Sequence, residues 1–305
     1  MFSIRTDLAI ESGEMFREQN PGLGEIEGVK TEVYKSDKYT STTVLIESEE
    51  GSRALTKPIG TYITIEADGL MENDITAFDE ISEALKNELS KLLGDTKGKS
   101  ILVAGLGNRE ITPDSVGPKV VSRMLVTRHI FSEMPALSDS LYSVCAVAPG
   151  VLGITGIETL EILRGIIEKA NPDAIIVIDA LAARKIERLG TTIQISDTGI
   201  IPGSGVANSR KALNEETLGV KTYAIGVPMV VDAVTLVRDA LGEVQTENEK
   251  KDEILSSHLK TPSYMICPQN IDALSDRISS VLSRGINLAL QKNLDAEDIL
   301  ALTAK

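Results

Sequence analysis

The stretch Ile101-Leu-Val-Ala-Gly-Leu-Gly-Asn-Arg-Glu-Ile-Thr-Pro-Asp114-Ser-Val-Gly-Pro118 joins a continuous apolar run to a glycine-rich turn and an acid. Such a run is typical of a buried strand in a parallel sheet. A second run, Ala174-Ile-Ile-Val-Ile-Asp179, also ends in an acid. Open α/β sheets bind ligands at the carboxyl ends of their strands. If the two strands are neighbours, we expect Asp114 and Asp179 to face one another.

The remainder of the chain after residue 100 alternates between strand and helix patterns, which predicts an α/β fold with a mostly parallel sheet and helices on both faces. Before it, apolar residues spaced three and four apart from Ile75 to Leu92 predict a helix that Gly94 ends. The predicted strands lie near 100–106, 141–148, 174–179, 191–196 and 222–227, and the predicted helices near 115–128, 156–170, 230–241 and 268–291.

The N-terminal part has a different pattern. Residues 1–24 are polar and predict one short helix. Three segments rich in β-branched residues follow, at 26–34, 42–47 and 61–67. They predict an antiparallel β-hairpin unit, either as an appendage or as one edge of the sheet. The charged stretch Glu243–Glu253 predicts a solvated linker.

Composition restricts the function classes. The 305 residues carry a net charge of −14, which disfavours nucleic acid binding. No apolar run reaches the roughly 18 residues that span a bilayer, and the N-terminus lacks a secretory signal, so we expect a soluble cytoplasmic protein. Two cysteines and two histidines, Cys145, Cys267, His129 and His258, offer neither a disulfide framework nor a zinc site. We therefore expect no metal and no other cofactor.

The turn Gly105-Leu-Gly107-Asn108 resembles a dinucleotide-binding fingerprint only in part. Its third glycine should stand at position 110, which is Glu. The insertion before the following helix would also hold a pyrophosphate away from the helix N-terminus. Nucleotide binding is therefore disfavoured.

Each acid has a structural explanation beside the functional one. Thr112-Pro-Asp114-Ser suits a helix N-cap. Asp179 could pair with Arg184 or cap a helix over residues 180–184. The functional alternative is a carboxylate pair, in which like charges raise one pKa. One acid then stays protonated and donates to a carbonyl while the other activates water, as in aspartic-type hydrolysis.

A third strand end carries another glycine-rich loop, Ser196-Asp197-Thr-Gly-Ile-Ile-Pro-Gly203-Ser204-Gly205-Val-Ala-Asn208. Its backbone N–H groups could bind an extended peptide or an oxyanion, or the loop could be a plain surface connection. We expect Asp197, Gly203, Ser204 and Gly205 to contribute to substrate binding, with Asp197 as a third acid on the same sheet edge.

These residues resemble the germination protease family, endopeptidases that degrade small acid-soluble spore proteins. The matching motifs run in order from the N-terminus to about residue 240. They are Ser3-Ile-Arg-Thr-Asp7-Leu8-Ala, Gly105-Leu-Gly-Asn, Thr112-Pro-Asp114, Gly117-Pro-Lys, Pro149-Gly-Val-Leu-Gly-Ile-Thr-Gly-Ile-Glu-Thr159, Ile178-Asp179-Ala-Leu-Ala-Ala-Arg184, Gln194-Ile-Ser-Asp-Thr-Gly-Ile200, Pro202-Gly-Ser-Gly and Val231-Asp-Ala.

The resemblance implies that Asp114 and Asp179 are the catalytic pair of an atypical aspartic-type peptidase. The sheet is also similar to that of hydrogenase maturation peptidases, in which the matching acids and a histidine hold a metal ion. No suitable histidine is found here. Two alternatives stay open: a metal-dependent amidase that uses Asp114, Asp179 and Asp197, and a non-enzymatic peptide-binding factor whose aspartates only cap helices.

The resemblance further implies a self-processing zymogen that loses residues 1–7 by cleavage between Asp7 and Leu8. Arg5-Thr-Asp-Leu-Ala-Ile-Glu11 is similar to the cleavage sequence of the substrates. The implied organisation is a propeptide over 1–7, an N-terminal extension with the hairpin unit over 8–74, and a catalytic α/β domain over 75–305. We expect small acid-soluble spore proteins as substrates, the developing spore and spore core as the location, and a homo-oligomer.

Overall fold

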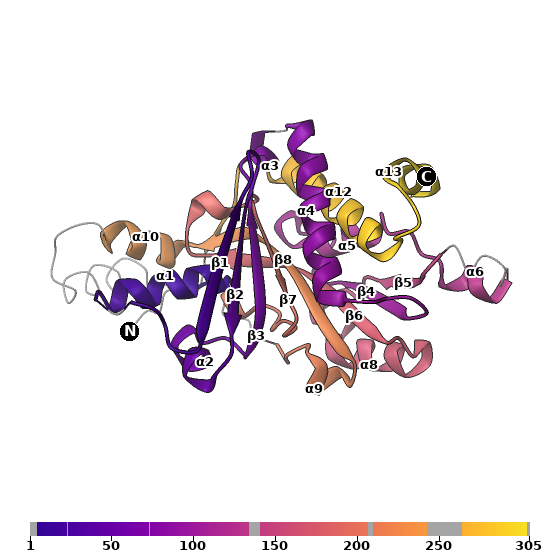
Figure 1. The fold of residues 1–305 in the computed structure, drawn as a ribbon, viewed down its shortest axis with the longest axis horizontal. Helices are drawn as coiled ribbons and strands as arrows, with labels where there is room; N and C mark the ends of the chain where they lie inside the picture. The colour runs from indigo at the N-terminus through magenta and orange to yellow at the C-terminus, as the bar shows by residue number, and fades with distance from the viewer. Residues whose placement is uncertain are drawn as a thin grey trace.

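The computed structural model describes residues 5–22, 24–72, 74–133, 141–206, 210–242 and 264–303. These ranges form an α/β fold around one mixed sheet of nine strands (Figure 1). The predicted linker Glu243–Glu253, His258 and Asn208 lie outside them. None of the helices in the described ranges is long and apolar enough to cross a membrane.

The strands follow the order β1-β2-β3-β7-β8-β6-β4-β5 across the sheet, with the short β9 paired to β8. Four of them, β5, β4, β6 and β8, run parallel, and the others pair antiparallel. Their bounds are β1 Val29–Lys35, β2 Thr40–Ile46, β3 Gly60–Glu66, β4 Ser100–Gly105, β5 Ser143–Val147, β6 Ala174–Ala183, β7 Thr192–Ser196, β8 Lys221–Asp232 and β9 Met265–Ile266.

The α/β class is therefore confirmed, with two refinements. The N-terminal hairpin unit is not a separate appendage, because β3 pairs antiparallel with β7 and so joins the main sheet. The second refinement concerns β7, which was expected among the parallel strands. It runs antiparallel to β8.

The helices surround this sheet on both faces. Their bounds are α1 Ala9–Gln19, α2 Glu49–Leu55, α3 Gly69–Glu72, α4 Ile75–Leu93, α5 Val116–Val121, α6 Arg128–Glu133, α7 Leu152–Thr155, α8 Thr159–Ala170, α9 Glu215–Leu218, α10 Ala233–Gly242, α12 Ile271–Leu290 and α13 Ala296–Thr303. Short 3₁₀ turns are η1 Thr112–Asp114, η3 Ile186–Arg188 and η4 Ser204–Val206.

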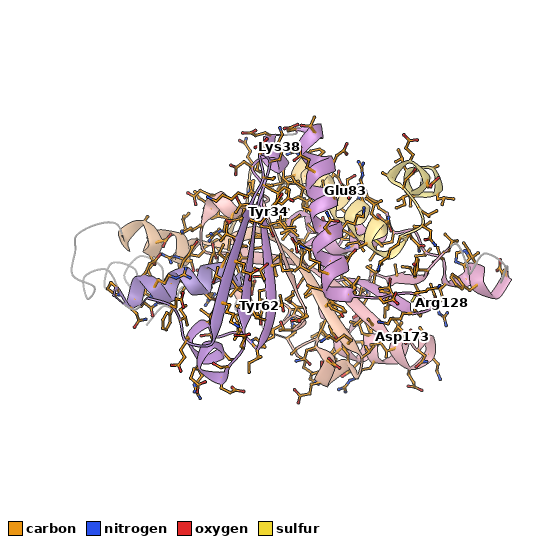
Figure 2. The ribbon with its side chains drawn as sticks, in the orientation of Figure 1. Tyr34, Lys38, Tyr62, Glu83, Arg128 and Asp173 are labelled. Atoms are coloured by element: carbon orange, nitrogen blue, oxygen red, sulfur yellow. The ribbon has the colours of Figure 1, made fainter. Side chains whose placement is uncertain are left out.

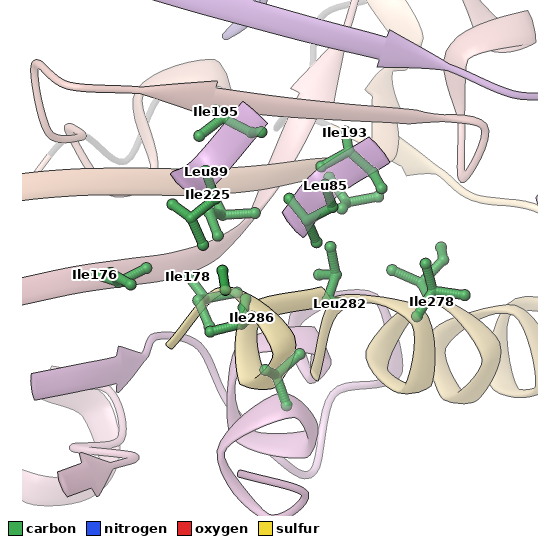
Figure 3. Close-up of a cluster of buried hydrophobic side chains, with 14 of the residues drawn as sticks. Leu85, Leu89, Ile176, Ile178, Ile193, Ile195, Ile225, Ile278, Leu282 and Ile286 are labelled. Carbon is green, nitrogen blue, oxygen red and sulfur yellow. The ribbon is translucent and has the colours of Figure 1, made fainter. Parts of the chain in front are cut away.

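The larger core lies on the face covered by α4, α5 and α12. Figure 3 shows Leu85 and Leu89 of α4 and Leu282 of α12 packed against isoleucines of β6, β7 and β8. The predicted apolar stripe of α4 makes this contact, and the helix ends at Gly94 as expected.

At the turn of the β1–β2 hairpin, Lys38 forms an ion pair with Asp74 at the start of α4 (Figure 2).

The second face is covered by two separate groups of helices. Leu163 of α8 and Leu218 of α9 pack over β4 and β6, and α1 and α2 pack over β2 and β3. Between these groups, residues of β7, β8 and β6 border the segment before α1 and the loop after β7. The segment before α1 fills this gap in the helical cover, so the carboxyl end of β6 is buried at Leu181, Ala182 and Ala183.

The helix predicted for 115–128 is shorter than expected. It ends at Val121 because Asn287 of α12 binds the backbone that follows. Its side chain accepts a hydrogen bond from Leu125 N–H at 3.0 Å and donates one to the Arg123 carbonyl at 3.1 Å.

Candidate functional site

Asp114 is brought to the sheet edge by a tight crossing after β4. A Cβ atom on Gly105 would lie 2.1 Å from the Gly117 carbonyl oxygen, so the strand end and α5 approach closely only because glycines stand there. Gly107 has a φ of 107°, and a Cβ atom on it would lie 2.0 Å from the Asp114 carbonyl oxygen. The Asn108 N–H donates to Asp114 Oδ2 at 2.7 Å. The glycine-rich turn therefore fixes the Asp114 carboxylate.

Asp179 lies within β6, between β4 and β8, at the centre of the sheet. Its side chain is 5% exposed. Its Oδ1 accepts the Ala180 N–H at 2.9 Å, and the neighbouring carbonyl of Ile178 accepts the Leu106 N–H at 2.7 Å. The β4–β6 pairing therefore places the Asp179 carboxyl next to the turn that carries Asp114.

The two carboxyl groups interact electrostatically. Burial raises the pKa of Asp179 well above its ordinary value, and the charges of Asp114 and Asp7 raise it further. Burial also raises the pKa of Asp114, against the hydrogen bond from Asn108 N–H, which lowers it. Neither carboxylate is paired with a lysine or arginine in the described ranges. Of the two carboxyl groups, Asp179 is therefore the one whose protonated form is favoured more strongly.

Both aspartates line one cavity of about 490 Å³. It is bordered by the turn after β4, the end of β6 and the loop after β7, and also by elements to which we assigned no role from sequence. These are Gly150 to Gly153, Glu158, Thr159, Arg210, Val230 and Met265. From sequence, the Pro149–Thr159 motif was noted only as part of the family resemblance. Because it follows the parallel strand β5, its position after a strand could have predicted that it lies at this edge of the sheet.

The structural explanations for the two acids are wrong. Asp114 does not cap α5, whose N-cap is Ser115, and accepts the Asn108 N–H instead. The helix expected over 180–184 is absent, because β6 continues to Ala183 in its pairing with β8. Arg184 is bound to Asp239 and Glu18, not to Asp179.

Residues of the loop after β7 line two different cavities. Gly203 lines the cavity with the two aspartates, whereas Ser204 and Gly205 line a second cavity of about 570 Å³. Asp197 does not share the edge with the other acids, because β7 runs antiparallel and ends toward the opposite side of the sheet. Its Oδ1 accepts the Thr61 N–H at 2.8 Å, at the start of β3.

The segment before α1 lies in the second cavity, which Tyr62 of β3 also lines (Figure 2). The Asp7 N–H donates to the Ala182 carbonyl at 3.0 Å, and Asp7 Oδ2 accepts the Ala182 N–H at 2.9 Å. Ser204 Oγ donates to Asp7 Oδ1. Leu8 is fully buried against Leu181 and its neighbours. The expected cleavage junction is thus docked on β6 at Ala182, three residues along the strand from Asp179 and in a different cavity from the aspartate pair.

Glu11 anchors the other end of this segment. It is fully buried and accepts the Arg184 N–H at 2.7 Å and the Lys185 N–H at 3.1 Å. Arg188 Nη1 lies 3.2 Å from Glu11 Oε1. Two acids four residues apart are therefore each held by dedicated donors, one at Asp7 and one at Glu11.

The described ranges contain no cluster of three or more His, Cys, Asp or Glu side chains that could hold a metal ion. The aspartate pair supplies two carboxylate side chains, one short of such a cluster. Asp197, the third ligand of the metal-dependent alternative, is engaged at the start of β3.

The family model and the sequence relatives agree on one family. Residues 9–245 match the family model described as Germination protease. The chain is 43% identical to the germination proteases of Caldanaerobacter subterraneus subsp. tengcongensis and Clostridium perfringens, with 98% of this chain and 98% of each relative covered. It is 37% identical to that of Bacillus cereus, over 99% of this chain and 97% of the relative.

A solved structure of a nickel–iron hydrogenase maturation protease from Thermococcus kodakarensis is 16% identical and covers 65% of this chain and 98% of its own, with a TM-score of 0.35. The family match over most of the chain and the full-length relatives are the findings that assign it. This chain belongs to the germination protease family.

Proposed function

We propose that this family member is an atypical aspartic-type endopeptidase that hydrolyses small acid-soluble spore proteins during germination. The observation that carries the proposal is Asp179, buried without a basic partner in the described ranges, beside Asp114 in one cavity. Burying an unpaired charge is costly, so such a carboxyl is kept protonated. A protonated acid next to an ionised one is the arrangement that hydrolysis by an aspartate pair requires.

The difference in burial between Asp114 and Asp179 supports an assignment of the general base and the general acid. Asp114, more exposed and held by the Asn108 N–H, takes the role of general base and removes a proton from water. Asp179 keeps its proton and donates it as the peptide bond breaks. Gly203 and the residues of the Pro149–Thr159 motif that line the cavity position the substrate chain.

The docked N-terminal segment supports a zymogen with a propeptide over residues 1–7, of which residues 1–4 lie outside the described ranges. Ser204 Oγ and the Ala182 N–H bind the Asp7 carboxylate, and Arg188 binds Glu11. A substrate with acids at the same spacing can form the same contacts once the segment leaves. Largely unfolded substrates could enter as extended chains.

The wider setting follows from this role. We place the protein in the developing spore and spore core, acting on protein substrates as a homo-oligomer, with no direct nucleic acid binding at its net charge of −14. Residues 8–74 form the N-terminal extension and residues 75–305 the catalytic domain, joined through the β3–β7 pairing.

The deciding experiment incubates the purified chain with small acid-soluble spore proteins and identifies the fragments by mass spectrometry. We expect cleavage after an acid by the wild type. The Asp114→Asn and Asp179→Asn variants should fold but lose about 10²-fold or more in rate, since each loses proton transfer. Near-full turnover by either variant would refute the aspartate pair.

A further inference from the structure

Three strands align residues of the site in one row. Asp179 of β6 is in register with Gly226 of β8, and Gly226 is in register with Gln194 of β7. Residues in register extend from the same face of a sheet, and neighbouring strands lie about 4.8 Å apart. The Asp179 and Gln194 side chains therefore extend from one face, with Gly226 between them. The Leu181 side chain packs over this glycine, because a Cβ atom there would lie 2.3 Å from Leu181 Cδ1.

The docked segment crosses this row. The Asp7 carbonyl accepts a hydrogen bond from Gln194 Nε2 at 3.2 Å, and the Ala9 N–H donates to Gln194 Oε1 at 2.7 Å. One carboxamide thus binds the backbone on both sides of the Asp7–Leu8 peptide bond.

A second donor reaches the same carbonyl oxygen. Lys57 Nζ lies 2.8 Å from it. Lys57 follows α2, and its backbone is fixed on both sides by Ser52: the Lys57 N–H donates to the Ser52 carbonyl at 3.2 Å, and Ser52 Oγ donates to the Lys57 carbonyl at 2.8 Å. The side chain forms no ion pair within the described ranges. Its amino group is thus directed at a backbone carbonyl and not at a carboxylate. Burial lowers the pKa of Lys57, and the charges of Asp7 and Glu11 oppose this by raising it.

We propose that Lys57 and Gln194 form the oxyanion site of the peptidase, a role that rests on the proposed function. Two donors on one carbonyl oxygen are the arrangement that stabilises the negative charge of a tetrahedral intermediate. The peptide bond that they hold is fixed by Ser204 at Asp7 and by the burial of Leu8.

Asp114 takes one proton from water, whose oxygen bonds to the Asp7 carbonyl carbon. The carbonyl π electrons move to the oxygen, where Lys57 and Gln194 stabilise the charge. The intermediate then collapses: the bond from Asp7 carbon to Leu8 nitrogen breaks, and the Asp179 proton passes to that nitrogen. The products are a carboxyl group on Asp7 and a free amine on Leu8.

Self-processing of the full-length chain tests this role directly, because the bond is already docked and its cleavage needs no separate binding step. We expect Lys57→Met to lower the first-order rate of Leu8 release by about 10²- to 10³-fold, as loss of one oxyanion donor does. Hydrogen exchange should show the Leu8 and Ala9 amides as protected as in the wild type. Lys38→Met, which removes the same charge at the β1–β2 turn, should process at the wild-type rate.

A Lys57→Met rate within threefold of the wild type would overturn the inference, and so would a lower rate accompanied by loss of amide protection, which would make Lys57 a docking residue only. If Lys57→Met does not fold, Lys57→Arg decides: it keeps the charge but displaces it, and a rate at least tenfold lower is expected, whereas an unchanged rate refutes the role.

Different results would contradict the oxyanion site alone and the proposed peptidase function as a whole. A wild-type chain that cleaves added spore proteins in an Asp179-dependent way but never releases Leu8 would overturn the oxyanion assignment alone. A chain that does neither, or that cleaves equally well as Asp179→Asn, would overturn the peptidase mechanism and this inference together.

Discussion

Asp179 and Asp114 lie on one cavity but in unequal surroundings: the first is buried within a central strand, and the second is partly exposed on a turn held by Gly107. The charge of Asp114 adds to the effect of burial in raising the pKa of Asp179. This inequality separates the two roles that hydrolysis needs, and it makes the acid–base pair testable through stability as well as through activity.

The Asp179→Asn variant should be more stable than the wild type near neutral pH. Because the pKa of Asp179 is raised on folding, the native chain holds this proton at pH values where the unfolded chain, with a pKa of about 3.9, has lost it. The native state then binds more protons, so wild-type stability falls as pH rises through this range. Asn has no such dependence.

We therefore expect a gain of a few degrees in Tm for Asp179→Asn at pH 7, shrinking toward zero near pH 4. Thermal unfolding followed by circular dichroism across this range measures it. Glu216→Gln, which removes a charge on the exposed side of α9, serves as the control and should shift Tm by less than about a degree at any pH. Equal pH profiles for Asp179→Asn and the wild type would contradict the buried proton.

Chelators should leave peptidase activity unchanged. The cavity offers two carboxylates, and Asp197, the third acid of a metal-dependent site, is bound to the Thr61 N–H instead. Activity is measured on spore-protein substrates before and after dialysis against EDTA. Loss of activity that one divalent ion restores would favour the metal-dependent amidase.

Replacing Gly107 should displace the Asp114 side chain, because the glycine-rich turn that fixes it could no longer keep its conformation. The Gly107→Ala variant meets the Asp114 backbone at 2.0 Å in a backbone region that alanine rarely adopts. We expect a loss of about 1–3 kcal/mol in the free energy of unfolding and at least a tenfold fall in kcat. Gly165→Ala on α8, where a Cβ atom has nothing within 4 Å, is the matched control and should be neutral or slightly stabilising. Full activity in Gly107→Ala would show that Asp114 needs no support from this turn.

The strands that carry both aspartates could be predicted because continuous apolar runs are typical of parallel strands buried on both faces. The direction of β7 could not, since Thr192–Ser196 would show the same pattern in either orientation. The extension of β6 was missed because Ala180–Ala183 favours a helix locally, and pairing with β8 overrides that preference. Contacts between Asp7 and Ala182 join residues 175 positions apart, and no local pattern reports them.

Self-processing should depend on pH through the aspartate pair. The reaction needs one proton on the pair, and the raised pKa of Asp179 makes that proton more available as pH falls from neutral. Asp114, whose pKa is also raised, takes up a second proton at lower pH, and the general base is then lost. We therefore expect a bell-shaped rate profile with its maximum at mildly acidic pH.

The measurement is N-terminal sequencing of the full-length chain after incubation at each pH, with Leu8 as the expected new first residue. The Asp179→Asn chain should remain intact at every pH, because it lacks the carboxyl that donates the proton to the leaving amine. If that variant were processed at the same bond as quickly as the wild type, cleavage would have to come from a different protease. Self-activation would then be wrong even if the peptidase assignment stood, and the docked Asp7–Leu8 bond would be only a mimic of substrate.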